Sequence, residues 1–218
     1  MTNDLEKQAA ASAGQRLRAS DALRGVKVSQ AADYGYSDNP DPVPHADLPP
    51  RFRRYRLSDY PGAMSKAVEP FLADDDCCSL YLWGETGSRK TSFATAILME
   101  MREQAQCRVG CFVPAYLAVQ AFRTFDDSGA KQRVDQWKTE PWLILDDLGK
   151  HRDTPHVIEQ MLFLIHYRYD WAKPGHKTIL TANLDLNEFA KRVDPATARR
   201  LSEGLVLELK TATGGKGS

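Results

Sequence analysis

Eight residues near the middle of the chain combine the groups that can hold a polyphosphate. The segment reads G-E-T-G-S-R-K-T and lies between a short apolar run, residues 79–83, and a stretch with helical periodicity that starts at residue 91. A loop of the form G-x-x-x-x-G-K-[S/T] indicates a phosphate-binding site only between a strand and a helix, because the loop N–H groups and the helix N-terminus then face the phosphates. The predicted phosphate-binding loop comprises Gly84, Glu85, Thr86, Gly87, Ser88, Arg89, Lys90 and Thr91.

Three side chains of this loop decide what it can do. We expect Lys90 to place a positive charge near the β- and γ-phosphates, and the Thr91 hydroxyl to coordinate Mg²⁺. Arg89 departs from the motif, because it stands where a glycine normally lets the backbone approach phosphate without a Cβ. The arginine either obstructs the loop or points outward and adds positive charge. The first alternative predicts weak or absent hydrolysis on a preserved fold.

Two carboxylates follow an apolar strand downstream of the loop. The run W-L-I-L, residues 142–145, ends in Asp146 and Asp147. Ligands of open α/β sheets gather at the carboxyl ends of the strands. We therefore expect Asp146 to hold Mg²⁺, directly or through water, and Asp147 to orient or deprotonate an attacking water. A single aspartate at this place is usually a turn residue, but two after a buried strand indicate an ATP- and Mg²⁺-dependent site.

These side chains need a sheet to position them, and apolar runs alternate with helical patterns from residue 51 onward. The run at 142–145 is apolar throughout, as expected when both faces of a sheet are covered. The predicted strands are 79–83, 108–113, 142–145, 177–182 and 205–209, and the predicted helices are 91–106, 115–125 and 155–171. Such alternation favours an α/β fold with a mostly parallel five-stranded sheet flanked by helices and joined by right-handed crossovers.

The ends of the chain differ from this core. Residues 1–50 are rich in Ala, Ser, Asp and Pro and lack a long apolar period, so we interpret them as a flexible arm. Such an arm is usually only a tail, although it is also suited to docking a partner. We place the ATPase domain at residues 51–210 and a disordered tail at residues 211–218.

Bulk composition excludes several other classes of protein. Lys and Arg together number 29, as do Asp and Glu, so any nucleic-acid site must be a local patch. The sequence shows neither a signal peptide nor an apolar stretch of the roughly 20 residues that a membrane helix needs, which predicts a cytoplasmic protein. The cysteines lack zinc-site spacing and are interpreted as reduced, buried thiols: Cys77, Cys78, Cys107 and Cys111.

Taken with these motifs, the chain resembles the DnaC/IstB group of AAA+ P-loop ATPases, which are helicase loaders and transposition helpers. The resemblance covers roughly residues 51–209 and includes R-F-R at 51–53, Y-P at 60–61, L-D-D-L-G-K at 145–150, Y-R-Y at 167–169 and L-T-A-N-L at 180–184. It implies that Asn183, after the fourth strand, touches the γ-phosphate and the attacking water. By itself an asparagine at a strand end is most often a turn residue.

The same resemblance points to an arginine that acts between subunits. The segment R-R-L at 199–201, followed by Gly204 and an apolar strand, looks like the family's arginine-finger box, in which Arg200 matches best. A finger reaches a neighbour's γ-phosphate and implies self-association on ATP binding. The bland alternative is a solvated arginine pair on a helix. A second sensor arginine, common in the family, has no match before the chain ends at Ser218.

The family also grips single-stranded DNA between its second and third strands. In this chain that interval holds aromatic and basic residues suited to base stacking and phosphate contact: Phe122, Arg123, Phe125, Lys131 and Arg133. The two phenylalanines are also three residues apart, which is ordinary spacing for the core face of a helix.

Three functions remain open at this point. The first is an ATP-hydrolysing partner of a replicative helicase, acting as its loader in DNA replication, or of a transposase, acting as its helper. The second is a small-molecule kinase, which needs an arginine-rich lid that the residues after Asp147 do not offer. The third is a non-hydrolysing module that keeps the fold to bind DNA or protein, and Arg89 is the residue that favours it.

Overall fold

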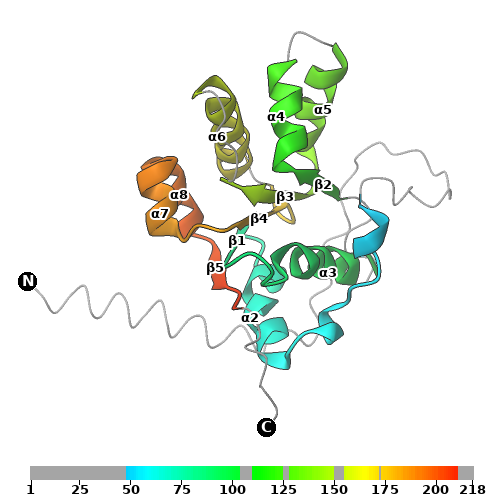
Figure 1. Cartoon of the computed structure of the whole chain (residues 1–218). Helices are drawn as coiled ribbons and strands as arrows, with labels where there is room; N and C mark the ends of the chain where they lie inside the picture. Colours follow the sequence, from blue (N-terminus) through cyan, green and yellow to red (C-terminus); the bar gives the residue numbers. More distant parts are fainter. Residues whose placement is uncertain (1–47, 104–109, 125–127, 150–154, 172, 211–218) are drawn as a thin grey trace, which may run out of the picture. The chain divides into compact units, whose positions relative to one another are not determined.

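The computed structural model describes residues 48–103, 110–124, 128–149, 155–171 and 173–210, in which strands and helices alternate (Figure 1). The strands are β1 (Ser79–Trp83), β2 (Cys111–Pro114), β3 (Trp142–Leu148), β4 (Lys177–Ala182) and β5 (Leu205–Glu208). The helices are η2 (Pro50–Phe52), η3 (Leu57–Asp59), α2 (Gly62–Ala73), α3 (Lys90–Glu103), α4 (Ala115–Arg123), α5 (Ser128–Thr139), α6 (Pro155–Asp170), α7 (Leu186–Arg192) and α8 (Pro195–Ser202). None of the helices in these ranges is long and apolar enough to cross a membrane.

The five strands form one sheet in the order β2-β3-β4-β1-β5, and every paired neighbour runs parallel. Strand β1 occupies an inner position, since Leu80 lies opposite Ile179 of β4 on one side and Leu205 of β5 on the other. The predicted α/β class with a five-stranded, mostly parallel sheet is therefore confirmed. Because all strands point the same way, the loops after β1, β3 and β4 emerge along one edge of the sheet.

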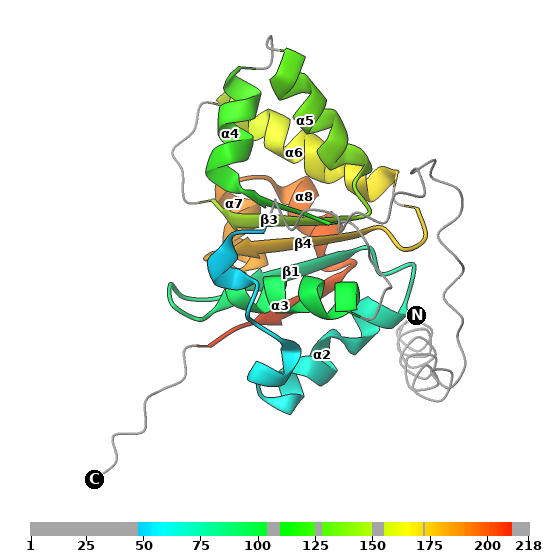
Figure 2. The ribbon, with the colours of Figure 1, turned by 90° about the vertical axis from the view of Figure 1, so that its right-hand side faces the viewer.

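Two helical layers cover the sheet, as Figures 1 and 2 show. Alternate residues of a strand point to opposite faces, and β1 illustrates this, since Leu80 and Leu82 join the cluster around α2 and α3, whereas Tyr81 joins the cluster under α4, α5 and α6. The same arrangement explains why β3 is apolar at consecutive positions, because Leu143 packs in the cluster on one face of the sheet and Ile144 in the cluster on the other. These five side chains are at most 1% exposed.

Helix α5 is an element that the sequence prediction omitted. Its buried residues, Ala130, Val134 and Trp137, follow helical spacing, but the remaining positions are mostly polar. The three-residue stripe packs against α4 and α6, where the Trp137 ring meets Phe122 at 6.4 Å between centroids. A narrow apolar stripe is sufficient for a helix that covers other helices on one side only.

A buried guanidinium joins α6 to the amino ends of β3 and β4. Arg168 is 5% exposed and donates to the carbonyls of Trp137 (2.7 Å), Glu140 (2.6 Å) and Lys177 (3.0 Å), and to the Thr178 hydroxyl (2.8 Å). Burial lowers the pKa of Arg168 to about 10, so the group remains charged at neutral pH. Its role within the tyrosine–arginine–tyrosine run is therefore structural.

The segment before α2 packs on the outer side of α3. Leu48 is 1% exposed, Phe52 meets Phe112 at 5.9 Å between ring centroids, and Tyr60 meets Phe93 at 4.8 Å. Arg53 Nε also donates to the Leu48 carbonyl at 2.9 Å. Packing therefore begins at least as early as Leu48, inside the stretch assigned to the arm.

Candidate nucleotide-binding site

The loop between β1 and α3 has the backbone geometry of a phosphate cradle. Gly84 and Gly87 have φ values of +149° and +90°, which disfavour any residue with a Cβ. A Cβ on Gly84 would also lie 2.1 Å from the Leu209 carbonyl oxygen. That close approach arises because Leu209 N–H donates to Trp83 O at 2.7 Å, which brings the chain after β5 alongside the start of the loop. Glycine is thus obligatory at residue 84.

The Lys90 ammonium lies inside this cradle. It donates to the carbonyls of Gly84 and Glu85, both at 2.8 Å, and to the Ser88 hydroxyl at 3.2 Å. Lys90 and Ser88 are 7% and 5% exposed, whereas Glu85, Thr86 and Gly87 form an exposed tip. A buried ammonium in a glycine loop that leads into a helix N-terminus is the chemistry that binds the β- and γ-phosphates. The residues present therefore fit a nucleoside triphosphate.

Arg89 takes the second of the two orientations left open by its sequence. Its backbone lies in the left-handed region with φ +66°, as expected for a position normally held by glycine. The side chain is exposed and lies against the segment before α2, where its Cζ is 4.7 Å from the centre of the Tyr60 ring and 5.7 Å from that of Tyr55. The guanidinium thus points away from the phosphate cradle.

The acidic strand end meets the start of α3. Thr91 Oγ1 donates to Asp146 Oδ1 at 2.8 Å, and Thr181 Oγ1 donates to the same carboxylate oxygen at 2.7 Å. A hydroxyl and a carboxylate in contact are the hard oxygen ligands that Mg²⁺ prefers. Within the described ranges no group of three or more His, Cys, Asp or Glu residues could hold a metal alone. Phosphate and water oxygens would complete such a site, as is usual for Mg²⁺.

Asp147 is the second non-glycine residue with left-handed geometry in the described chain, at φ +68°. Its N–H donates to Thr181 Oγ1 at 2.8 Å, and its side chain is only half-buried. The register of β3 against β4 shifts here, between Leu145 and Leu148. The backbone therefore turns at the position predicted to activate water.

Thr181 is a site residue that sequence reasoning missed. It is 1% exposed, and its one hydroxyl donates to Asp146 and accepts from Asp147 N–H. A hydroxyl inside the apolar T-I-L-T-A run, two residues before Asn183, was the available signal.

Asn183 follows β4, whose last residue, Ala182, lies opposite Trp83 of β1 and Leu148 of β3. It therefore lies at the same edge as the phosphate loop and the acidic pair, and it is half-exposed. The chain just beyond it is fixed, since the Tyr81 hydroxyl donates to Leu184 O at 2.8 Å. The position suits a polar group that contacts the outer phosphate.

Arg200 does not join this cluster. Its Nη2 lies 3.6 Å from Asp170 Oδ1, and its Cζ lies 5.5 Å from the Tyr169 ring. Asp170 ends α6, and Arg200 lies five positions before the first residue of β5, so both are near the amino ends of the strands. Burial, aided by the charge of Arg200, lowers the pKa of the neighbouring His166. The phosphate loop of the same chain lies at the opposite edge.

The predicted DNA-binding residues differ in their exposure to solvent. Phe122 is 2% exposed and packs in the core, so its proposed stacking on bases is wrong and its spacing reflects helix packing. Phe125 lies outside the described residues. Arg123, Lys131 and Arg133 are exposed on α4 and α5.

An exposed aromatic row along α6 and the residue after it was not anticipated. Phe163, Tyr167 and Trp171 follow one another at ring-centroid distances of 6.3 Å, and Phe163 and Trp171 are 52% and 70% exposed. Lys138 of α5 places its ammonium 5.5 Å from the Phe163 ring and 5.6 Å from the Tyr167 ring.

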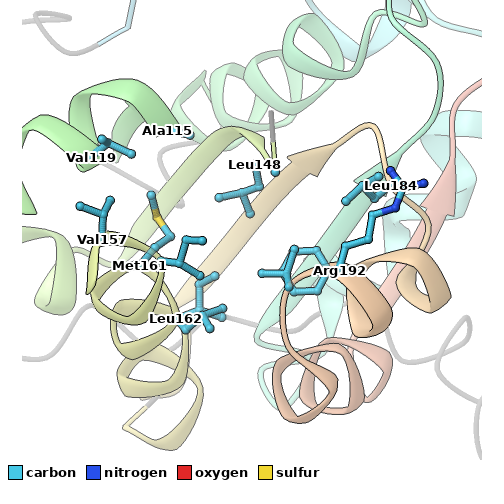
Figure 3. A pocket seen from close by; sticks show the side chains of 13 residues that line it. Ala115, Val119, Leu148, Val157, Met161, Leu162, Leu184 and Arg192 are labelled. Carbon is cyan, nitrogen blue, oxygen red and sulfur yellow. The ribbon is translucent and has the colours of Figure 1, made fainter. Parts of the chain in front are cut away.

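A cavity of about 160 Å³ lies beside the acidic strand end but is distinct from the phosphate cradle (Figure 3). Val157, Met161 and Leu162 of α6 face Leu184 and Arg192 across it. The lining is apolar apart from Arg192, which pairs with Glu188 at 3.0 Å. An apolar space without a second cation does not suit a triphosphate, so the nucleotide site is assigned from the chemistry of the loop.

Two sequences of established proteins are similar to this chain. The phage-like element PBSX protein XkdC of Bacillus subtilis (strain 168) is 30% identical over 179 residues, which is 74% of this chain and 64% of that protein. The replicative helicase loader DnaI of the same organism is 29% identical over 83 residues, 38% of this chain and 26% of that protein. The chain thus spans less than two thirds of either relative. No protein-family model matches it.

Solved structures share the fold. The crystal structure of the DnaC helicase loader matches with a TM-score of 0.65 at 23% identity, over 74% of this chain and 100% of that one. AMPPCP-bound DnaA from Aquifex aeolicus matches with a TM-score of 0.56 at 17% identity, over 74% of this chain and 51% of that one. The chain has the AAA+ P-loop fold, and the resemblance to the DnaC/IstB-type proteins is confirmed.

Proposed function

From its assignment to the DnaC/IstB-like AAA+ family, which the fold and the sequence similarities support, we propose that this chain is an ATP-hydrolysing helicase loader. In this proposal ATP binding switches the protein between states that hold and release a replicative helicase on single-stranded DNA. The similarity to a protein named as a replicative helicase loader favours a helicase over a transposase as the partner.

The observation that carries the proposal is the pair of hydrogen bonds that meet on Asp146. Thr91 belongs to the phosphate loop and Thr181 to β4, yet both hydroxyls contact the same carboxylate oxygen, at 2.8 and 2.7 Å. Asp146 is 9% exposed, and two neutral hydroxyls leave the negative charge of its carboxylate for a cation to neutralise, as a bound metal would do. Thr91 and Asp146 therefore supply a preformed magnesium site next to Lys90, and Thr181 positions the carboxylate.

The positions of the site residues suggest a role for each of them in ATP hydrolysis. Bound Mg-ATP would supply the electrophilic phosphorus and a metal that neutralises charge on the phosphate oxygens. Lys90 would hold the β- and γ-phosphates, Thr91 and Asp146 would hold the metal, and Asp147 would orient the attacking water or accept its proton. Asn183 would contact the outer phosphate from the end of β4. Thr181 would keep the two aspartates in register.

Self-association is part of the proposal because of where Arg200 lies. An arginine near the amino ends of the strands cannot reach the nucleotide of its own chain at the opposite edge. It can reach the nucleotide of a neighbour in a head-to-tail assembly, which is how an arginine finger acts. In the isolated chain Asp170 and Tyr169 hold the guanidinium.

We also propose that single-stranded DNA contacts the α4–α5 side of the chain. The exposed cations there, Arg123, Lys131 and Arg133, can meet phosphates. Stacking would have to come from exposed rings other than Phe122, and Tyr116 of α4, at 53% exposure, is such a ring.

Nucleotide titration and turnover assays, with and without single-stranded DNA and a replicative helicase, test the proposal. The parent should bind Mg-ATP and hydrolyse it, and Asp147→Asn should bind it without turnover, because the metal keeps Asp146 while the water loses its base. Mixing Asp147→Asn with Arg200→Ala should restore part of the activity if the finger acts between subunits. Absence of turnover in every assembly, with or without nucleotide binding, would instead favour the non-hydrolysing module and refute the ATP-hydrolysing loader.

A further inference from the structure

We propose that Tyr60, assisted by Tyr55, is a positioning residue that holds Arg89 in its left-handed conformation and thereby keeps the phosphate loop competent to bind ATP. The inference rests on the proposed function, because it concerns the affinity of the loop for nucleotide. It makes the nucleotide affinity of the loop depend on Tyr60, which lies about thirty residues before Arg89 in the sequence.

The need for such a residue follows from the backbone of Arg89. A φ of +66° places its Cβ close to the following carbonyl, which disfavours the conformation for any residue except glycine. The penalty corresponds to a factor of about five to thirty in the population of the conformer. If Arg89 relaxed to a negative φ, the N–H groups of residues 88–90 would turn away from the phosphates. Something in the folded chain must therefore favour the strained conformer.

The two tyrosine rings provide that contact. The Arg89 guanidinium lies 4.7 Å from the centre of the Tyr60 ring and 5.7 Å from that of Tyr55, within the range of cation–π attraction. Such contacts favour the conformer that makes them by a factor of about two to thirty, the larger values applying to partly buried pairs. The strain and the attraction are therefore of the same size, and loss of a ring should shift the balance.

Tyr60 is the stronger of the two because it is itself immobilised. It is 7% exposed, its ring packs edge-on against Phe93 at 4.8 Å, and its N–H donates to Leu57 O at 3.1 Å. Phe93 lies in α3, the helix that the phosphate loop enters. The ring thus links the segment before α2 to both the start of α3 and the side chain that precedes Lys90.

A double-mutant cycle tests this link. The four proteins are the parent, Tyr60→Leu, Arg89→Gly and the double variant, and each is titrated with Mg-ATP. We expect Tyr60→Leu to weaken binding about five- to tenfold in the parent but less than about twofold in the Arg89→Gly background, where the strain is absent. Equal loss in both backgrounds would overturn the proposal, because it would mean that Tyr60 acts only through packing on Phe93.

Two further variants separate the ring from its surroundings. Tyr60→Phe keeps an aromatic face over Arg89 and should recover most of the affinity that Tyr60→Leu loses. Tyr55→Leu removes a ring that is half-exposed, so it provides a folded protein even if Tyr60→Leu does not fold. We expect a smaller loss for Tyr55→Leu, about twofold, and again only when Arg89 is present. Loss from Tyr55→Leu in the Arg89→Gly background would count against the proposal.

Thermal unfolding of the same four proteins keeps the inference testable without nucleotide. Tyr60→Leu should lower the unfolding midpoint by about 2–4 °C more in the parent than in the Arg89→Gly background. The packing lost on Phe93 is common to both backgrounds and cancels in the cycle. Failure of all four proteins to bind Mg-ATP would refute the proposed function, whereas equal lowering of the midpoint in both backgrounds would refute the role of Tyr60.

Discussion

The two ends of the candidate site each contain a non-glycine residue with left-handed geometry, and the chain stabilises them by different means. Arg89, at φ +66°, lies with its side chain over the tyrosines of a separate segment, and its carbonyl accepts from Phe93 N–H at 2.9 Å and from Ser92 Oγ at 3.0 Å. Asp147, at φ +68°, is held by its backbone, whose N–H donates to Thr181 in the neighbouring strand. The loop end thus has cation–π contacts from a separate segment, whereas the acidic end has a hydrogen bond between neighbouring strands.

The difference matters because the two residues bear different strain. Aspartate adopts left-handed geometry several times more readily than most residues, so one hydrogen bond worth about 0.5–1.5 kcal/mol can suffice. Arginine has no such preference and incurs about 1–2 kcal/mol, which cation–π contacts of about 0.5–2 kcal/mol can offset. We expect the acidic end to be rigid and sensitive to small changes, and the loop end to be tolerant of them.

Lys90→Ala should cause the largest loss of Mg-ATP affinity, against which the changes at the two ends of the site can be compared. Removal of the ammonium eliminates the charge that faces the phosphates and leaves the carbonyls of Gly84 and Glu85 without their shared donor. Mg-ATP affinity should fall by at least about a hundredfold, since charge-assisted hydrogen bonds contribute about 1.5–3 kcal/mol each. Calorimetric titration would measure this loss, and circular dichroism would establish that the fold persists. Affinity equal to that of the parent would show that residues 84–91 are not the phosphate site.

Thr181→Val should come next, because it breaks the acidic end while keeping the shape of the side chain. Asp146 loses a donor, and the partly buried Asp147 N–H loses its acceptor, so stability should decrease by about 1–3 kcal/mol. The rate of ATP hydrolysis should fall as well, since Asp146 and Asp147 lose the hydroxyl that fixes their relative positions. Chemical denaturation and an ATPase assay would measure the two effects. Thr181→Ser keeps the hydroxyl and is the matched control, so a serine variant as impaired as the valine variant would argue for packing instead.

Arg89→Gly should have the smallest effect, because it removes the strain and the compensating contact together. We expect Mg-ATP affinity to change by less than about fivefold, since the opposing contributions of about 1–2 kcal/mol nearly cancel. Titration of the variant beside the parent would test this. Tightening by an order of magnitude or more would show that the arginine obstructs the loop despite its outward orientation.

The sequence predicted the sheet and the site where local signals were strong. The apolar runs of β1 and β4 were located to the residue, because fully buried parallel strands leave little ambiguity. The acidic pair was found because it follows the apolar run at 142–145, although β3 itself continues through both aspartates to Leu148. The turn at Asp147 was not found, since a left-handed residue inside a strand leaves no sign in the composition. Helix α5 was missed because it presents only a narrow apolar stripe.

Long-range contacts explain the other omissions. The orientation of Arg89 depends on Tyr55 and Tyr60, and the sequence analysis noted Tyr60 only as part of the family-like Y-P pair at 60–61. The hydroxyl of Thr181 gains its role only when β3 and β4 pair. Conversely, Phe122 offered an aromatic group beside cations, and only packing against Trp137 revealed that it belongs to the core. The boundary of the arm, the tail and the role of Asn183 remain predictions.

The contacts of Arg168 also bear on the order in which the chain folds. Its partners lie at most 31 positions away, so the stretch from α5 to β4 can close with short loops. By contrast, β1 must insert between β4 and β5, and its Tyr81–Leu184 hydrogen bond spans 103 positions. Closing a long loop costs more conformational entropy than closing a short one. We therefore expect the stretch from α5 to β4 to fold first and β1, which precedes the phosphate loop, to join the sheet late. Pulsed hydrogen exchange during refolding should then protect the amides of β3 before those of β1.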